Sequence, residues 1–325
     1  MMTTPYFLIT IDTEGDNLWQ NDHNITTQNA QFLTRFQNLC EQYHFKVNYL
    51  TNYEMAKDHD FIQFGKDIIN RGTGEIGTHL HAWNNPPIHQ ITDDDYTYKT
   101  YLIDYPDQQM KDKFDYLHKL LEDTFSTPMK THRAGRWALD KRYLHLLSEY
   151  NYWVDCSVTP CVNWSSTMGA PLGLGGTDYS TFPQQAYFMD LDTMQSGESS
   201  LLQVPMSIRY KYTPTIQNLK NILHKLQGKH KPNSTLWLRP KKNNLKQMMQ
   251  LSQDVLNSGS DYLEFMLHSS EFMPSGSPTF RTHEDIEKLY QDLAQLFKFL
   301  SNKVTGATLS EYYLYQCALH NKTPT

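Results

Sequence analysis

The chain of 325 residues carries 29 Lys and Arg against 35 Asp and Glu, which gives a net charge of −6. This acidic balance argues against a nucleic-acid-binding protein, because phosphate contacts require an excess of basic residues. With 39 % hydrophobic and 20 % charged residues, the chain can bury a core and is not an extended disordered protein. Its apolar runs have the length of strands, whereas a membrane-spanning helix needs roughly 20 apolar residues. We therefore expect neither a nucleic-acid partner nor a transmembrane segment.

The N-terminal residues lead directly into a strand pattern, with no basic region and no long apolar stretch that could act as an export signal. This favours a cytoplasmic protein. No stretch has the composition of a linker, so residues 1–325 are expected to form a single domain. The four cysteines lack a Cys-x-x-Cys spacing and are expected to be reduced and structural.

Apolar, β-branched runs alternate with runs of helical period along the chain. The predicted strands cover residues 6–11, 45–50, 75–81, 152–154, 202–208, 235–238 and 262–267. The predicted helices cover residues 32–43, 61–69, 110–125, 143–147, 219–226, 245–256 and 286–300. A final strand and helix follow, with Thr308 as a cap before Glu311. Two long polar segments, 83–105 and 161–187, are predicted to be loops. This alternation is typical of an α/β protein with a parallel sheet or barrel.

Polar side chains gather at the ends of four predicted strands or apolar segments. They are Asp12 and Glu14 after the first strand, His79 and His81 at the end of the third, Arg133 after a short apolar segment, and His268 after a late strand. Any one of them alone would more simply satisfy backbone amides in a turn. Because strand–helix barrels carry their active sites at the C-terminal ends of the strands, the convergence predicts an active site.

The spacing of His79 and His81 favours metal binding, because residues two apart on a strand point to the same face. With one carboxylate they would form a two-histidine, one-acid set that leaves a position open for water, as in catalytic zinc sites. The same spacing could also arise from two histidines that form hydrogen bonds in a polar turn.

Five segments of the chain resemble the motifs of the polysaccharide deacetylases of carbohydrate esterase family 4. They are residues 10–15 (TIDTEG), 75–81 (EIGTHLH), 132–136 (HRAGR), 155–164 (DCSVTPCVNW) and 267–271 (LHSSE). The resemblance implies a distorted (β/α)7-type barrel with long loops over its C-terminal mouth. It also implies a metal-dependent deacetylase whose first motif supplies a catalytic base and a metal ligand. The second motif would supply histidine ligands, the third an arginine that pairs with the catalytic acid, and the fifth a leucine–histidine pair.

Three departures from the common motifs point to a divergent branch of that family. The first motif has an acid, a spacer and a second acid in place of two adjacent aspartates. The position of the second histidine is occupied by Trp83, which makes His81 the second ligand, with His89 or Asp16 as outside alternatives. The aspartate–tryptophan pair of the fourth motif appears as Asn163 and Trp164, so its acid is either missing or supplied by Asp155.

The resemblance and the strand-end pattern together assign roles. Glu14, His79 and His81 are assigned to a divalent metal, with Zn²⁺ the first candidate and cobalt, nickel and manganese left open. Asp12 is assigned as general base, held by Arg133, and His268 as general acid that approaches from the far side of the barrel.

The substrate is expected to be a carbohydrate or glycolipid. Trp83, Trp137 and Trp164 could stack on a sugar ring, although large aromatic residues often belong to the core. Arg136 could bind a substrate carboxylate or phosphate, and a simple salt bridge is an equal alternative.

Three classes of function follow from these residues. The first is a metal-dependent hydrolase that removes an acetyl or other acyl group from an N-acylated sugar or a surface-polysaccharide intermediate. The second is a metal-dependent deformylase or another hydrolase of a C–N bond. The third is a barrel that binds a polysaccharide without turnover. A base and an acid together argue against a pure binder.

Overall fold

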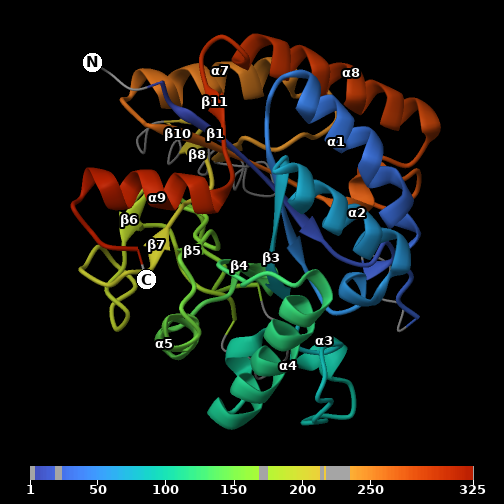
Figure 1. Ribbon diagram of the computed structural model, residues 1–325, viewed down its shortest axis with the longest axis vertical. Helices are drawn as coiled ribbons and strands as arrows, with labels where there is room; N and C mark the ends of the chain where they lie inside the picture. Colours follow the sequence, from blue (N-terminus) through green and yellow to red (C-terminus); the bar gives the residue numbers. More distant parts are fainter. Residues whose placement is uncertain (1–3, 19–23, 168–174, 213–215, 217–234, 325) are drawn as a thin grey trace.

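The computed structural model describes residues 4–18, 24–167, 175–212, 216 and 235–324 (Figure 1). One curled sheet forms its centre, in the order β10-β1-β2-β3-β4-β5-β7-β6. Its strands are β1 (Tyr6–Thr13), β2 (Val47–Thr51), β3 (Gly74–Leu80), β4 (Thr131–Ala134), β5 (Val154–Asp155), β6 (Tyr187–Phe188), β7 (Leu202–Gln203) and β10 (Tyr262–His268). Neighbouring strands run parallel, apart from the antiparallel pair β6 and β7, and β11 (Thr305–Gly306) pairs with β1.

A separate two-stranded antiparallel sheet lies between β10 and the segment after β5. It consists of β8 (Ile208–Tyr210) and β9 (Thr235–Trp237). On one side the backbone N–H of Met206 donates to the carbonyl of Val158 at 3.0 Å. On the other, the hydroxyl of Ser207 accepts from the N–H of Glu264 on β10 at 2.9 Å. The curled sheet and the two-stranded sheet together confirm the predicted distorted α/β barrel.

Amphipathic helices lie around the outside of the sheet, as Figure 1 shows. They are α1 (Leu33–Gln42), α2 (His59–Arg71), α4 (Asp107–Phe125), α5 (Lys141–Glu149), α7 (Leu245–Asn257), α8 (His283–Leu300) and α9 (Leu309–Leu319). The buried faces of the first six of these helices and the strands form the largest apolar cluster, whereas α9 packs in a second cluster with Leu8, Val154 and Leu202. Thr308 caps α9 as predicted, since its side chain accepts from the N–H of Glu311 and the Glu311 carboxylate accepts from the N–H of Thr308. No described helix is both long and apolar enough to cross a membrane.

Several predicted boundaries were wrong. The segment 83–105 contains a helical turn, α3 (Asp95–Tyr98), because Asp94 caps it by accepting from the N–H of Thr97. The stretch 202–208 is not one strand, since β7 ends at Gln203 and β8 begins at Ile208. Arg133 lies within a strand rather than after an apolar segment. The predicted helix 219–226 lies outside the described residues.

Gly77 allows β3 to pass close to both neighbouring strands. A Cβ atom at this position would overlap the Thr131 side chain on β4 and would lie 2.7 Å from a methyl group of Leu50 on β2. We expect Gly77→Ala to lower the free energy of unfolding by about 1–3 kcal/mol, the usual range for overpacking. The measurement is urea unfolding followed by circular dichroism.

The matched control is Gly72→Asn, because Gly72 has φ +66° and open space around its Cβ position, and asparagine tolerates this backbone region. Equal stability losses in the two variants would show that packing at β3 is not the cause.

Candidate active site

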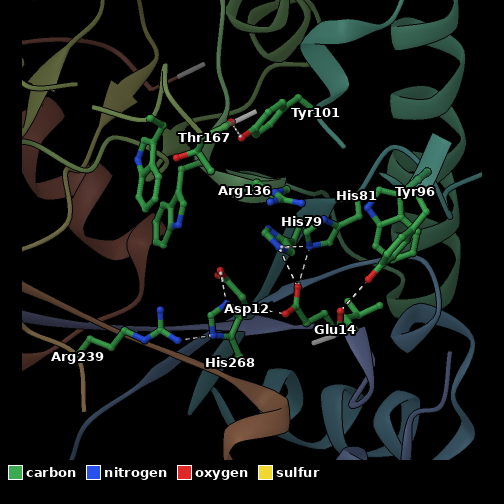
Figure 2. Close-up of a pocket in the computed structure, with 14 residues that line it drawn as sticks. Asp12, Glu14, His79, His81, Tyr96, Tyr101, Arg136, Thr167, Arg239 and His268 are labelled. Carbon is green, nitrogen blue, oxygen red and sulfur yellow. Dashed lines mark hydrogen bonds and ion pairs between the residues drawn. The ribbon is translucent and has the colours of Figure 1, made fainter. Parts of the chain in front are cut away.

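The C-terminal ends of the parallel strands surround a cavity of about 470 Å³ (Figure 2). Its wall contains every residue that the sequence singled out for the site except Arg133. These residues are Asp12, Glu14, His79, His81, Trp83, Arg136, Trp137, Trp164 and His268. Arg133 is fully buried beneath the wall. The structure therefore brings together residues from the N-terminal, central and C-terminal parts of the sequence.

Three of these side chains converge on one point. Glu14 follows β1, His79 lies on β3 and His81 directly follows that strand. The Glu14 Oε2 atom lies 2.8 Å from Nε2 of His81 and 3.5 Å from Nε2 of His79, and the two Nε2 atoms are 3.2 Å apart. This cluster is buried, and its three ligand atoms lie within 4.8 Å of one another.

The hydrogen bonds of His79 suit a metal ligand. Its Nδ1 atom lies 2.9 Å from the backbone carbonyl of Arg133. Because a carbonyl only accepts, Nδ1 carries a proton, and in the neutral ring the lone pair is on Nε2, which faces the cluster. Two imidazole nitrogens and one carboxylate oxygen are a donor set that fits a divalent ion such as Zn²⁺.

The electrostatics of this cluster favour a positive charge. Burial raises the pKa of Glu14, but His268 and the hydrogen bonds from His79 and His81 outweigh it and hold the pKa well below its ordinary value. Burial lowers the pKa of His79, yet the charges of Asp12 and Glu14 leave it raised. A cation at this point therefore meets an ionised carboxylate.

Arg133 holds Asp12 from below. Its Nη1 atom donates to Asp12 Oδ1 at 2.6 Å, and its Nη2 atom donates to Glu264 at 2.5 Å and to the hydroxyl of Thr10 at 2.8 Å. The Nε atom donates to the carbonyl of Cys156 at 3.2 Å. Arg133 thus connects β4 with β1 and β10 through the interior of the sheet.

The pKa values of the two acids that contact Arg133 are shifted in opposite directions. Burial raises the pKa of Asp12, but the charge of Arg133 outweighs it and the pKa lies below its ordinary value. Burial also raises the pKa of Glu264, and there it prevails over Arg133. Oε2 of Glu264 is buried and accepts no hydrogen bond from the described residues. Asp12 is therefore the more readily ionised of the two acids opposite Arg133.

His268 is the cross-strand neighbour of Asp12, because the two residues are in register on β10 and β1. The expectation that His268 approaches from the far side of the barrel was wrong, since β10 lies directly beside β1. The Nε2 atom of His268 lies 3.8 Å from both Asp12 Oδ2 and Glu14 Oε1. Base and acid candidates thus occupy adjacent strands at one wall of the cavity.

Glu271 and Arg239 contact the other ring nitrogen of His268. Nδ1 lies 3.2 Å from Glu271 Oε2 and 2.9 Å from Nη2 of Arg239, which also donates to Glu271 at 3.0 Å. Burial raises the pKa of Glu271, but Arg239 and His268 outweigh it and lower the pKa to about 2. Sequence reasoning missed Arg239, although it follows β9 by two residues and the strand-end rule could have found it.

Three outside candidates lie away from the cluster. Asp155 accepts from the ring of His132 at 2.7 Å and from the hydroxyl of Ser157 at 2.7 Å, and it does not line the cavity. Asp16 accepts from the hydroxyl of Thr26. His89 is exposed. Asp155, considered as the acid of the fourth motif, thus contacts His132 rather than a residue of the cavity wall.

Partly exposed aromatic rings form the upper wall of the cavity. Trp83 packs against Tyr96, with ring centroids 4.4 Å apart. Trp137 and Trp164 both pack against Trp237, with ring centroids 6.1 and 6.3 Å apart.

Arg136 and Trp137 both adopt the left-handed backbone region, with φ values of 54° and 64°. Two successive left-handed residues turn the chain after β4 back over the mouth. Sequence reasoning missed Tyr96 and Tyr101, which lie in the predicted loop 83–105.

Comparison with solved structures identifies the fold. A protein from Mycobacterium smegmatis described as a polysaccharide deacetylase is 12 % identical, with a TM-score of 0.54 over 100 % of this chain and 94 % of that one. A protein from Parabacteroides distasonis described as a glycoside hydrolase or deacetylase is 8 % identical, with a TM-score of 0.63 over 97 % and 72 %. The chain has the fold of the polysaccharide deacetylases.

The deacetylase fold does not by itself specify a reaction. A GH57-type branching enzyme from Pyrococcus horikoshii is also similar, at 8 % identity and a TM-score of 0.54 over 95 % of this chain and 70 % of that one. A scan of protein-family models and a search of curated proteins found no match. The chemistry of this deacetylase-like chain must therefore be argued from its own side chains.

The unequal roles of the two acids at Arg133 can be tested. We expect Arg133→Met to lower the free energy of unfolding by about 3–5 kcal/mol, because it leaves the buried Asp12 charge without its partner. Glu264→Gln should cost clearly less, because the amide has the shape of the carboxyl group, still accepts from Arg133 and leaves Asp12 as the charged partner. Urea unfolding of both variants is the measurement. A loss in Glu264→Gln as large as that in Arg133→Met would contradict the assignment.

Proposed function

We propose that this protein is a metal-dependent hydrolase that removes an acyl group, with acetyl the first candidate, from an N-acylated sugar. The observation that carries the proposal is the Glu14–His79–His81 cluster, with Asp12 and His268 on the wall of the same cavity. The deacetylase fold supports it. The two histidines beside Glu14 also favour hydrolysis at a metal. Cleavage of a glycosidic bond relies instead on a pair of carboxyl groups in most families.

Glu14, His79 and His81 would hold the metal. A divalent ion with an open position lowers the pKa of water and polarises an acyl carbonyl. Zn²⁺ is the first candidate because it accepts both imidazole nitrogen and carboxylate oxygen. The hydrogen bond from His79 to the Arg133 carbonyl fixes the ring so that Nε2 faces the cluster.

Asp12 would take the proton from the attacking water. Arg133 occupies Oδ1, while Oδ2 lies toward His268 and the cavity. The carboxylate is therefore oriented by one oxygen and available through the other. Because Arg133 holds its pKa below the ordinary value, Asp12 is ionised and able to accept a proton at neutral pH.

His268 would donate a proton to the amine as the C–N bond breaks. Glu271 and Arg239 contact Nδ1, which leaves Nε2 directed toward the two acids at the cavity wall. The buried Glu271 carboxylate stabilises a positive charge on the ring. Water thus supplies a hydroxyl to the acyl carbon, and the amine leaves with its proton.

Substrate contacts are assigned to the aromatic wall and to Arg136. Partly exposed rings of Trp83, Trp137 and Trp164 line the cavity and can pack against the apolar face of a sugar. Arg136 is exposed and lines the same cavity, where its guanidinium lies 5.5 Å from the ring centre of Tyr101. It forms no salt bridge with a carboxylate among the described residues, so it can contact the substrate.

The metal ligands can be tested without a substrate. We expect His79→Ala and His81→Ala to lose stoichiometric zinc, because each removes one of three ligands. Metal content after dialysis, by mass spectrometry, and zinc affinity, by calorimetry, are the measurements. His89→Ala removes an exposed histidine in the same part of the chain and serves as the control. Full zinc occupancy in His79→Ala would refute the ligand set.

The base can be separated from the ligands. We expect Asp12→Asn to keep bound zinc, because no ligand changes, and to lose about a hundredfold or more in kcat, the scale of one proton-transfer group. Amine release from N-acetylated oligosaccharides measures the rate, and Asp16→Asn is the control for the same chemical change nearby. Near-normal turnover in Asp12→Asn would exclude Asp12 as the base.

The same assay decides between the classes of function. N-acetylated and N-formylated aminosugars are offered in parallel, and the released acid is identified. Release of acetate supports the proposal, and release of formate alone makes the protein a deformylase. Stoichiometric zinc with saccharide binding and no released acid would contradict a hydrolase and indicate a binding barrel.

A further inference from the structure

The basic residues of this chain are unevenly distributed. Residues 199–253 contain ten Lys and Arg and no Asp or Glu, whereas the other 270 residues contain all 35 acids and 19 Lys and Arg. An acidic protein thus contains one strongly cationic segment. Its described part includes β8, β9 and Arg239, which lines the cavity.

Part of this segment forms a hollow of about 200 Å³, here called the basic hollow. It is lined by Lys211, Thr235, Leu236, Trp237, Lys241, Lys242, Asn243, Asn244 and Gln247. No carboxylate is among these residues. Lys242 forms an ion pair with Asp285 at 2.8 Å, whereas Lys211 and Lys241 form none with the described carboxylates. The described lining of the hollow therefore carries a net positive charge.

The turn that presents the lysines is held in place by Asn244. Its side-chain oxygen accepts from the N–H of Lys241 at 2.8 Å, and its amide donates to the carbonyl of Arg239 at 2.9 Å. Burial and the neighbouring charge of Arg239 lower the pKa of Lys241. A bound anion would relieve this repulsion between cations.

Trp237 and Arg239 connect the basic hollow with the cavity. Trp237 lines the hollow, and its ring packs against Trp137 and Trp164, which line the cavity. Arg239 lines the cavity beside His268, two residues before Lys241 (Figure 2). A saccharide that occupies the cavity can therefore extend along the tryptophans into the hollow.

We propose that the basic hollow is a subsite for a negatively charged group, a phosphate or a carboxylate, on the saccharide whose acyl group lies in the cavity. This inference rests on the proposed function and adds the class of its substrate: an anionic, N-acylated glycan. The recessed position beside an aromatic wall favours a group on a saccharide over an anionic membrane. Arg239 marks the boundary between the two sites, and its Nη2 atom is engaged with Glu271 and His268.

Binding to saccharides that differ in charge tests the subsite. The neutral probe is chitotetraose, the carboxylate probe is a hyaluronan tetrasaccharide, and the phosphate probe is UDP-N-acetylglucosamine, with N-acetylglucosamine as its neutral counterpart. All four contain N-acetyl groups. Calorimetry on the zinc-loaded protein should show at least one anionic probe binding about tenfold more tightly than its neutral counterpart. The probe that does so identifies the group as carboxylate or phosphate.

A double variant locates the effect. Lys211→Ala with Lys241→Ala should weaken the anionic probe about tenfold and leave the neutral probe unchanged. The control, Lys246→Ala with Lys298→Ala, removes two exposed lysines that do not line the hollow and should change neither affinity by more than about twofold. Equal losses in both double variants, or equal affinity of the parent protein for charged and neutral probes, would overturn the proposal.

Three further results are distinguishable from these. Binding of phosphatidylglycerol vesicles that is lost in Lys211→Ala with Lys241→Ala, without discrimination among saccharides, would make the hollow a membrane contact and overturn the subsite. Charge-selective saccharide binding without release of any acid would support the subsite while the proposed hydrolase fails. Acetate release from chitotetraose with no preference for charged probes would support the hydrolase while the subsite fails.

Discussion

The buried guanidinium of Arg133 is the interaction on which the site depends. A charge with no exposure to water must be neutralised and must satisfy its N–H groups, and Arg133 does so with groups from three parts of the barrel. These contacts fix β4 relative to β1 and β10 through the interior. They also hold one oxygen of Asp12 and leave the other toward the cavity. The backbone carbonyl of the same residue orients His79. The scaffold, the proposed base and the proposed metal ligand are thus coupled through one residue.

The parallel sheet explains how residues so distant in sequence come together. Register places Asp12 beside His268 and His79 beside Arg133 on neighbouring strands. Because side chains alternate along a strand, His79 and Arg133 can face the interior while Leu80 packs in the apolar cluster. The segments beyond the strands add the rings of Trp83 and Tyr96 and the left-handed turn at Arg136. The proposed chemistry is thus located at strand ends and the proposed substrate contacts largely on loops, which is typical of barrels.

Sequence reasoning predicted the barrel and the strands that bear the site, because period and strand-end polarity are local signals. It placed Glu14, His79 and His81 together from the spacing of the two histidines and from the resemblance of the first motif to that of the deacetylases, and in the structure their ligand atoms lie within 4.8 Å of one another. It did not predict Glu264 as a partner of Arg133, because a buried acid on an apolar strand gives no local signal of the residue it meets. Arg239 directly follows the predicted strand 235–238, so the strand-end rule could have found it. Closure of a barrel brings a late strand beside the first, and this accounts for the position of His268 next to Asp12.

The central claim is that Glu14, His79 and His81 hold one divalent ion. Anomalous diffraction from zinc-soaked crystals, recorded on both sides of the zinc absorption edge, tests it most directly. We predict a single strong peak in the cavity, about 2.0–2.2 Å from Nε2 of both histidines and from one carboxylate oxygen of Glu14. A peak bound through other residues, or a cavity without a peak while zinc binds elsewhere on the protein, would contradict the account.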